Sequence, residues 1–222
     1  MITIDQQQKL LLNIARRLTK KITVYAIGGT AMMFLGFKDT TLDIDIVFEN
    51  KKDRDIFKEA LKSLGYVGMD TIKVYGLKRN TPEMLKLADE RFDLFVVEVI
   101  DFIFSDTMKK RAEHIHQFGD NLILKIANPQ DIILMKCATD RIKDKDDARK
   151  IIDAIRIDWN MLIDEAKEQM SLGKERAAFD LGCFLEDLKT KMKVNIPQEV
   201  LDKLFEIVEK QAKEKSSKSK SL

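Results

Sequence analysis

Two short stretches decide how this sequence folds: Val24-Tyr-Ala-Ile-Gly-Gly-Thr-Ala31 and, further along, Leu42-Asp-Ile-Asp-Ile46. In the first, residues typical of a strand lead into Gly28 and Gly29, after which the pattern turns helical. Backbone N–H groups at a helix start bind phosphate when no side chain blocks the approach, and Thr30 adds a hydroxyl. A glycine pair alone is more often only a tight turn, so its interpretation depends on the second stretch.

The second stretch places two aspartates on one face of a strand predicted over residues 41–48. Asp is a poor strand residue and like charges repel, so Asp43 and Asp45 need a reason other than stability. Residues i and i+2 of a strand project the same way from Cα atoms about 7 Å apart, which lets both carboxylates reach divalent cations. Two Mg²⁺ ions about 4 Å apart clamp the attacking and leaving oxygens of a phosphoryl or nucleotidyl transfer, and Mg²⁺ arrives with a nucleoside triphosphate (NTP). The alternative, for an isolated Asp-x-Asp, is the solvated face of an edge strand.

Outward from these stretches, hydrophobic periodicity alternates between helix and strand as far as residue 127. It predicts helices over the first twenty residues, 30–35 and 56–64, and strands over 22–27, 41–48, 66–69, 73–77, 92–97 and 122–126. Beyond Asn128 the pattern is helical throughout. The prediction is an α+β fold: a small mixed sheet flanked by helices (1–127), an all-helical C-terminal part (128–213) and a disordered basic tail (214–222).

Composition narrows the class of protein. The 39 basic residues nearly cancel the 37 acidic ones, so net charge gives no argument for wrapping nucleic acid or coating a membrane. There is no apolar run of about 18 residues and no signal-peptide pattern, so we expect a cytoplasmic protein without membrane association. In that compartment Cys137 and Cys183 are expected to be buried free thiols. His114 and His116 have no cysteine near them in sequence, which favours exposed helix or loop residues over a zinc site.

Together, the glycine pair and the paired aspartates resemble the nucleotidyltransferase superfamily (polymerase beta-like), whose members carry a glycine pair after the first strand and two acids on the next. Within it, the chain is similar to a minimal prokaryotic and archaeal group containing AbiEii-like toxins and DUF6036 proteins. The similarity extends over residues 20–155 and is carried by Gly28 to Asp45 and by Pro129–Lys136 with the charged stretch 140–147. It implies a nucleotidyltransferase-like mixed sheet.

The resemblance also implies a third carboxylate on a later strand. Arg91-Phe-Asp-Leu-Phe95 matches the pattern and nominates Asp93, because its apolar neighbours are more strand-like than those of Glu98 and Asp101. The implied catalytic and metal-binding set is therefore Asp43, Asp45 and Asp93 with two Mg²⁺ ions, and Asp93 can also accept the proton of the acceptor hydroxyl.

The implied nucleotide-binding residues are Gly28, Gly29 and Thr30. Many superfamily members have Gly-Ser where this chain has the glycine pair, so here the hydroxyl on the phosphate has to come from Thr30.

Two lysines are further candidates for the nucleotide. Lys136 lies on a nearly all-apolar helix predicted over 131–138, where an ammonium must snorkel outward or meet an anion. Lys143 opens the next helical region. The resemblance suggests that both face the triphosphate across a cleft between the two parts, and the alternative is that 141–147 is a solvated charged turn.

These inferences predict a nucleotidyltransferase that moves a nucleoside monophosphate from an NTP to a hydroxyl of RNA, protein or a small molecule. The toxin-like resemblance makes RNA or protein the more attractive acceptor, suggests a cognate partner protein in a toxin–antitoxin pair, and the basic tail offers weak help to RNA. The alternative is a non-catalytic nucleotide- or partner-binding module with the same fold. The presence of all three acids, Asp43, Asp45 and Asp93, favours the enzyme, because a fold without catalysis has no physical reason to keep three acids converging.

Overall fold

The computed structural model describes residues 1–139 and 141–219. The chain divides into two compact units, Met1–Ile132 and a second that begins at Ile133. The sequence pattern predicts the change from mixed to helical texture slightly earlier, after residue 127.

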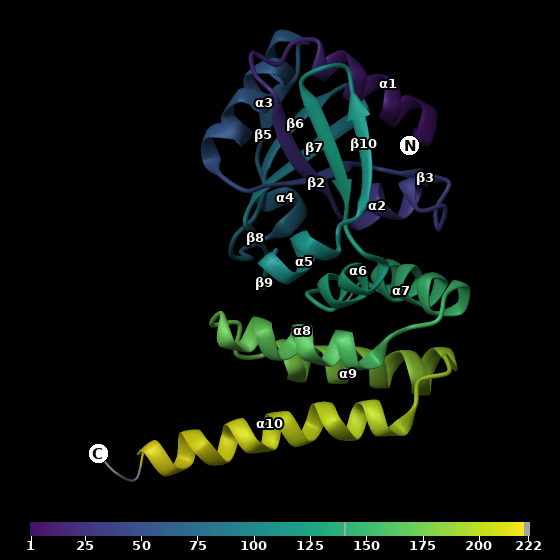
Figure 1. The fold of residues 1–222 in the computed structure, drawn as a ribbon, viewed down its shortest axis with the longest axis vertical. Helices are drawn as coiled ribbons and strands as arrows, with labels where there is room; N and C mark the ends of the chain where they lie inside the picture. The colour runs from purple at the N-terminus through teal and green to yellow at the C-terminus, as the bar shows by residue number, and fades with distance from the viewer. Residues whose placement is uncertain (140, 220–222) are drawn as a thin grey trace. The chain divides into compact units, whose positions relative to one another are not determined.

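One mixed sheet forms the first unit (Figure 1), with the strand order β10-β11-β2-β4-β7-β6-β5. The pairs β11–β2 and β4–β7 are parallel and the other neighbours along this path are antiparallel. Two short strands, β8 and β9, continue from β7, and a separate two-stranded ladder joins β1 and β3. The strand bounds are β1 Ile2–Thr3, β2 Ile22–Ala26, β3 Thr40–Thr41, β4 Ile44–Phe48, β5 Val67–Met69, β6 Glu83–Leu87, β7 Glu90–Val96, β8 Glu98–Val99, β9 Phe102–Ile103, β10 His114–Phe118 and β11 Leu122–Ile126. The predicted mixed sheet is confirmed.

Side-chain caps mark the start of three helices of this unit, α1, α3 and α5. At the start of α1, Thr3 and Gln6 form a reciprocal capping box, in which each side chain accepts a hydrogen bond from the other's backbone N–H. At the start of α3, the Asn50 side chain accepts from the Asp53 N–H at 2.9 Å. The bounds are α1 Ile4–Ala15, α2 Gly28–Phe34, α3 Lys51–Ser63, α4 Ile72–Tyr75, α5 Asp106–Arg111 and α6 Pro129–Lys136, the last crossing into the second unit.

The hydrophobic core lies between the sheet and α3. Ile44, Ile46 and Phe48 of β4 are fully buried, and Phe57 of α3 packs against the rings of Phe48 and Phe92 at centroid distances of 5.4 and 6.0 Å. Because successive side chains of a strand alternate between faces, burying these residues turns the aspartates of β4 and β7 to the opposite face. Core packing therefore orients the candidate site.

Several local predictions differ from the structure. Residues 73–77, predicted as a strand, contain the short helix α4, since the Asp70 side chain accepts the Ile72 N–H and Gly76 ends the turn at φ +61°. Strand β6 was not predicted. The two histidines lie on the edge strand β10 and not on a helix or loop, because only alternate residues of that strand need an apolar partner.

The predicted strand over 41–48 is interrupted. Thr40–Thr41 forms β3, a bend carries Asp43, and β4 begins at Ile44. Leu42, expected to share the apolar face of the strand, is exposed as a result. The bend frees Asp43 from the strict alternation of the strand.

Helices alone make up the second unit beyond α6, within the residues that the structure describes. Their bounds are α7 Ile142–Ala154, α8 Trp159–Ser171, α9 Ala177–Met192 and α10 Gln198–Ser219. Their apolar stripes are buried as predicted, with Ile151, Leu162 and Leu181 almost inaccessible to solvent. Of the predicted disordered tail, the part up to Ser219 continues α10, where Lys213 and Glu209 form an i, i+4 ion pair, and residues 220–222 lie outside the described residues.

Two further features agree with the sequence. Cys137 and Cys183 are free thiols, although each is only half-buried. Among the described residues no helix has the length and apolar character needed to cross a membrane.

Candidate active site

Three carboxylates converge on the face of the sheet opposite α3. Asp45 of β4 lies directly beside Asp93 of β7 in the parallel ladder, and Asp43 joins them from the bend before β4. One ligand oxygen from each lies within 4.8 Å of the others, and within the described residues this is the cluster suited to a metal ion. Asp93 is fully buried, whereas Asp43 and Asp45 are partly exposed. Oxygen ligands of this kind fit Mg²⁺, which prefers a few carboxylates together with substrate phosphates.

The glycine pair lies against this cluster because it has no side chains. Gly28 adopts φ +55°, and a Cβ there would sit 2.7 Å from Asp45 Oδ2. A Cβ on Gly29 would sit 2.6 Å from Thr41 Oγ1. These distances are too short for real contacts, so the start of α2 can approach the acids only with glycine at both positions.

Thr30 ties the glycine turn to the acidic strand. Its side chain is fully buried, and its Oγ1 accepts a hydrogen bond from the Asp45 N–H at 2.8 Å. The residue before the turn, Ile27, provides no side-chain cap to α2. Thr30 therefore fixes Asp45 relative to the turn, and its contact with phosphate stays a prediction.

Two residues at this site were missed by the sequence analysis, Arg91 and Tyr75. Arg91 lies two residues before Asp93 on β7 and donates from Nε to Asp93 Oδ1 at 2.8 Å and from Nη2 to Asp93 Oδ2 at 3.1 Å. Its Nη2 also donates to Asp43 Oδ2. Tyr75 of α4 donates its hydroxyl to Asp93 Oδ2 at 2.6 Å. The alternation of Arg91 and Asp93 on one strand was a usable signal, but Tyr75 comes from a segment predicted as a strand.

Burial and charge set the ionisation of the cluster. Burial raises the pKa of Asp93 to about 6, with Asp43 raising it further while Arg91 and the Tyr75 hydroxyl pull it down. The pKa of the Tyr75 hydroxyl is also raised, by burial first and then by the neighbouring carboxylates. For Arg91, burial alone lowers the pKa, but Asp93 and Asp43 outweigh it and the net change is upward. The acidic cluster thus includes one internal cation, the guanidinium of Arg91.

A second cation lies near the glycine turn. The Lys38 ammonium nitrogen is 4.0 Å from the position that a Cβ on Gly29 would take. The sequence analysis did not single out Lys38, which sits in a polar loop between α2 and β3 with no pattern to distinguish it.

The two predicted lysines belong to the second unit, where Lys136 has partners of its own. Lys136 Nζ lies 2.6 Å from Asp144 Oδ1 and 2.8 Å from Asp147 Oδ2, and all three side chains are buried. Burial lowers the pKa of Lys136, but the two aspartates outweigh it and raise the pKa overall. Lys143 is exposed on α7. These ion pairs account for the buried ammonium, and a role for either lysine with nucleotide stays a prediction.

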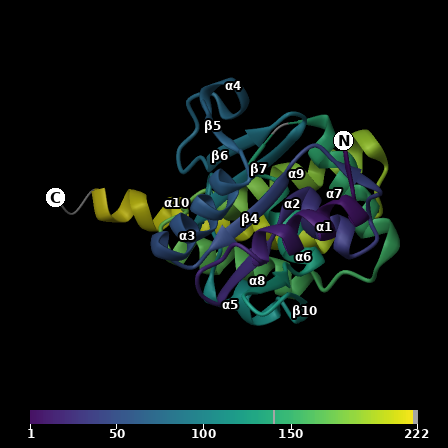
Figure 2. The same cartoon turned by 90° about the horizontal axis from the view of Figure 1, so that it is seen from above.

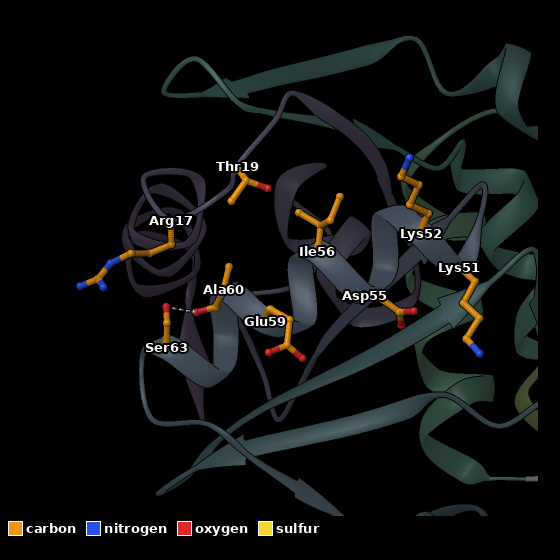
Figure 3. A pocket seen from close by; sticks show the side chains of 9 residues that line it. All are labelled: Arg17, Thr19, Lys51, Lys52, Asp55, Ile56, Glu59, Ala60 and Ser63. Carbon is orange, nitrogen blue, oxygen red and sulfur yellow. Dashed lines mark hydrogen bonds between the residues drawn. The ribbon is translucent and has the colours of Figure 1, made fainter.

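A separate pocket of the first unit lies between α3 and the segment that follows α1 (Figure 3). Its lining mixes Arg17 and Lys52 with Asp55 and Glu59, and includes none of the three clustered aspartates. The acidic cluster beside the glycine turn is therefore the candidate active site.

Comparison with known proteins identifies the family of the chain. The profile of the DUF6036 family, nucleotidyltransferases of unknown function, matches residues 1–193. The chain belongs to this family. The match of the DUF6036 profile includes both glycines and all three aspartates.

Solved structures give weaker similarities to this DUF6036 chain. A crystal structure of ANT(2″)-Ia in complex with adenylyl-2″-tobramycin is 16% identical, with a TM-score of 0.44 over 81% of this chain and 97% of that one. A solution structure of the antibiotic-resistance factor ANT(2″)-Ia is 14% identical, with a TM-score of 0.44 over 85% and 96%. A search of curated proteins gives no match. Similarity at this level carries no information about the acceptor used by the present chain.

Proposed function

We propose that this DUF6036 protein is a Mg²⁺-dependent nucleotidyltransferase that transfers a nucleoside monophosphate from an NTP to an acceptor hydroxyl. The observation that carries the proposal is the convergence of Asp43, Asp45 and Asp93 beside a turn that approaches them closely because Gly28 and Gly29 have no side chains of their own. Two Mg²⁺ ions held by these carboxylates would supply charge neutralisation at the triphosphate and at the attacking oxygen.

The other residues of the site have separate proposed roles. The backbone at Gly28 and Gly29, with Thr30 behind it, receives the phosphates, and Lys38 is near enough to add a positive charge. The acceptor oxygen attacks the α-phosphorus, the bond from that phosphorus to the bridging oxygen breaks, and pyrophosphate leaves. Asp93 accepts the acceptor's proton, a role suited to a carboxylate at the floor of the site. We keep Lys136 and Lys143 as candidates for the triphosphate.

RNA or protein is the favoured acceptor, on the resemblance to AbiEii-like toxins, and a small molecule remains open. The same resemblance supports a cytoplasmic toxin–antitoxin setting with a cognate partner protein.

A second candidate function is a non-catalytic nucleotide- or partner-binding module. One observation favours it: without a metal, Arg91 and Tyr75 already satisfy oxygens of Asp43 and Asp93. Such contacts can hold the three acids in place in a protein that does not carry out a reaction.

Incubation with each α-³²P-labelled NTP, Mg²⁺ and total RNA separates the two functions. Label that appears on RNA or on the protein with the wild type, and not with Asp43→Asn or with EDTA, supports transfer and names the acceptor class. Nucleotide binding without transferred label, across all four NTPs and with RNA, protein and a small-molecule extract each offered as acceptor, would favour the binding module.

A further inference from the structure

The guanidinium of Arg91 lies where a cation between Asp43 and Asp93 would lie. It reaches both oxygens of Asp93 and one oxygen of Asp43, while the Thr41 hydroxyl donates to the other Asp43 oxygen at 3.3 Å. Tyr75 adds a second hydrogen bond to Asp93 Oδ2. Each oxygen of these two carboxylates thus has a donor, so a divalent cation between Asp43 and Asp93 competes with Arg91 for the same position.

The two acids hold Arg91 unequally. Asp93 is fully buried, shares its strand with Arg91, and takes two of the guanidinium's hydrogen bonds. Asp43 has a side chain 17% exposed, lies in a bend, and takes one. The bond to Asp43 is therefore the one that yields, since the partly exposed Asp43 can turn away from Arg91 while the buried Asp93 stays beside it.

We propose that Arg91 exchanges partners at the acidic site: it holds Asp43 and Asp93 together until a divalent cation takes Asp43, and then directs its freed N–H groups to a phosphate of the nucleotide. The proposal rests on the proposed function. Its chemistry is that of the guanidinium fork, whose planar N–H groups fit a carboxylate and a phosphate equally well. Arg91 thereby supplies one positive charge to the acids before the metal binds, and the same charge to the triphosphate afterwards.

This exchange gives Arg91 effects of opposite sign on two ligands. Without nucleotide, the guanidinium repels a divalent cation and competes with it for Asp43, so its removal should tighten metal binding. With nucleotide and metal present, its removal costs a charge-assisted contact, so nucleotide binding should weaken. A residue that only supports the fold would move both affinities in the same direction.

The test is equilibrium binding to the full chain, with Arg91→Gln against the wild type. Binding of Mn²⁺ alone is measured from the electron paramagnetic resonance signal of free Mn²⁺. Binding of the non-hydrolysable α,β-methylene analogue of ATP is measured by calorimetry at saturating Mn²⁺. We expect Arg91→Gln to bind Mn²⁺ alone about tenfold more tightly, and the analogue about tenfold more weakly.

Arg54→Gln is the matched control. The Arg54 side chain is 16% exposed against 20% for Arg91, and it is likewise paired with two acids, Asp55 and Glu83, away from the cluster. This variant should bind both ligands as the wild type does.

Either of two results would overturn the exchange: weaker or unchanged Mn²⁺ binding by Arg91→Gln, or unchanged affinity for the analogue. If Arg91→Gln does not fold, Arg91→Lys keeps the charge but loses the fork, and should bind Mn²⁺ alone within about threefold of the wild type while still weakening the analogue. Equal analogue affinity in Arg91→Lys would then refute the phosphate contact. Absence of Mn²⁺ binding in the wild type, both alone and with the analogue, would instead refute the proposed function itself.

Discussion

Replacing Asp93 with Asn should stabilise the metal-free first unit at neutral pH, although it removes a member of the proposed active site. Burial raises the pKa of Asp93 from 3.8 to about 6. A rise of roughly two units corresponds to about 3 kcal/mol favouring the protonated over the charged carboxyl in the folded state. Asn mimics the protonated acid in shape and charge, so the variant avoids this cost.

The effect has a defined pH dependence. The folded-state pKa lies above the ordinary value, so the cost of a charged Asp93 is absent below about pH 4, grows as the pH rises, and is complete above about pH 7. We therefore expect Asp93→Asn to match the wild type near pH 4 and to exceed it by about 3 kcal/mol at pH 8.

The aromatic residues allow each unit to be followed separately. Tyr25, Tyr66 and Tyr75 are all in the first unit, and the single tryptophan, Trp159, is in the second. Urea unfolding in EDTA is followed by near-ultraviolet circular dichroism of the tyrosines, with Asp120→Asn, in the exposed turn after β10, as the control. A variant that is less stable than the wild type at pH 8, and whose deficit shrinks as the pH falls toward 4, would show that the Arg91 ion pair, and not burial, dominates at Asp93.

Substitutions at three further residues, Gly28, Lys38 and Lys136, test the remaining predictions. Gly28→Ala places a Cβ against the Asp45 carboxylate at positive φ, so it should destabilise the first unit by about 2 kcal/mol or more and abolish nucleotide binding. Gly36→Ala is the control, because Gly36 also has a positive φ but has open space around it, so this variant should show only the cost of backbone strain. Equal effects of the two variants on nucleotide binding would refute the close approach. Lys38→Ala should weaken MgATP binding about tenfold in calorimetry while Lys38→Arg retains it, and no loss in Lys38→Ala would remove this residue from the site. Lys136→Met removes the buried ammonium that lies between Asp144 and Asp147, while Asp144 keeps its contacts with Arg141 and Thr139, and should destabilise the second unit by about 3 kcal/mol, read from Trp159 fluorescence. For nucleotide affinity we expect Lys136→Glu to be worse than Lys136→Ala, and unchanged affinity in both would leave Lys136 a purely structural residue.

Local sequence patterns were sufficient where a single element carries its own signal. The run from Ile22 to Ala26 is β-branched and aromatic, and it forms β2. The helical stripes beyond Asn128 became α7 to α10, because an amphipathic helix must bury its stripe whatever it packs against.

The same approach failed where an element depends on its neighbours. Ile72, Val74 and Leu77 suggested a strand, but β5 is the last strand of the sheet and α4, which follows it, lies at that edge (Figure 2). These three apolar side chains are exposed, so no burial was available to hold an extended chain there. Tyr75 reaches Asp93 only because this segment turns into a helix.

The sequence by itself supplied the candidate residues: a glycine pair and two acids two residues apart from local pattern, and a third acid on an apolar strand through the resemblance to nucleotidyltransferases. Those signals are short-range, and each is legible within a few residues. Tertiary structure alone decided which charges meet. Parallel register sets Asp45 beside Asp93, the bend before β4 brings Asp43 to Arg91 across 48 positions of sequence, and Lys136 finds Asp144 and Asp147 within its own unit. The physical reason is that ion pairing depends on the distance between charges in space. Strand register and helix packing set this distance, and local periodicity does not encode it.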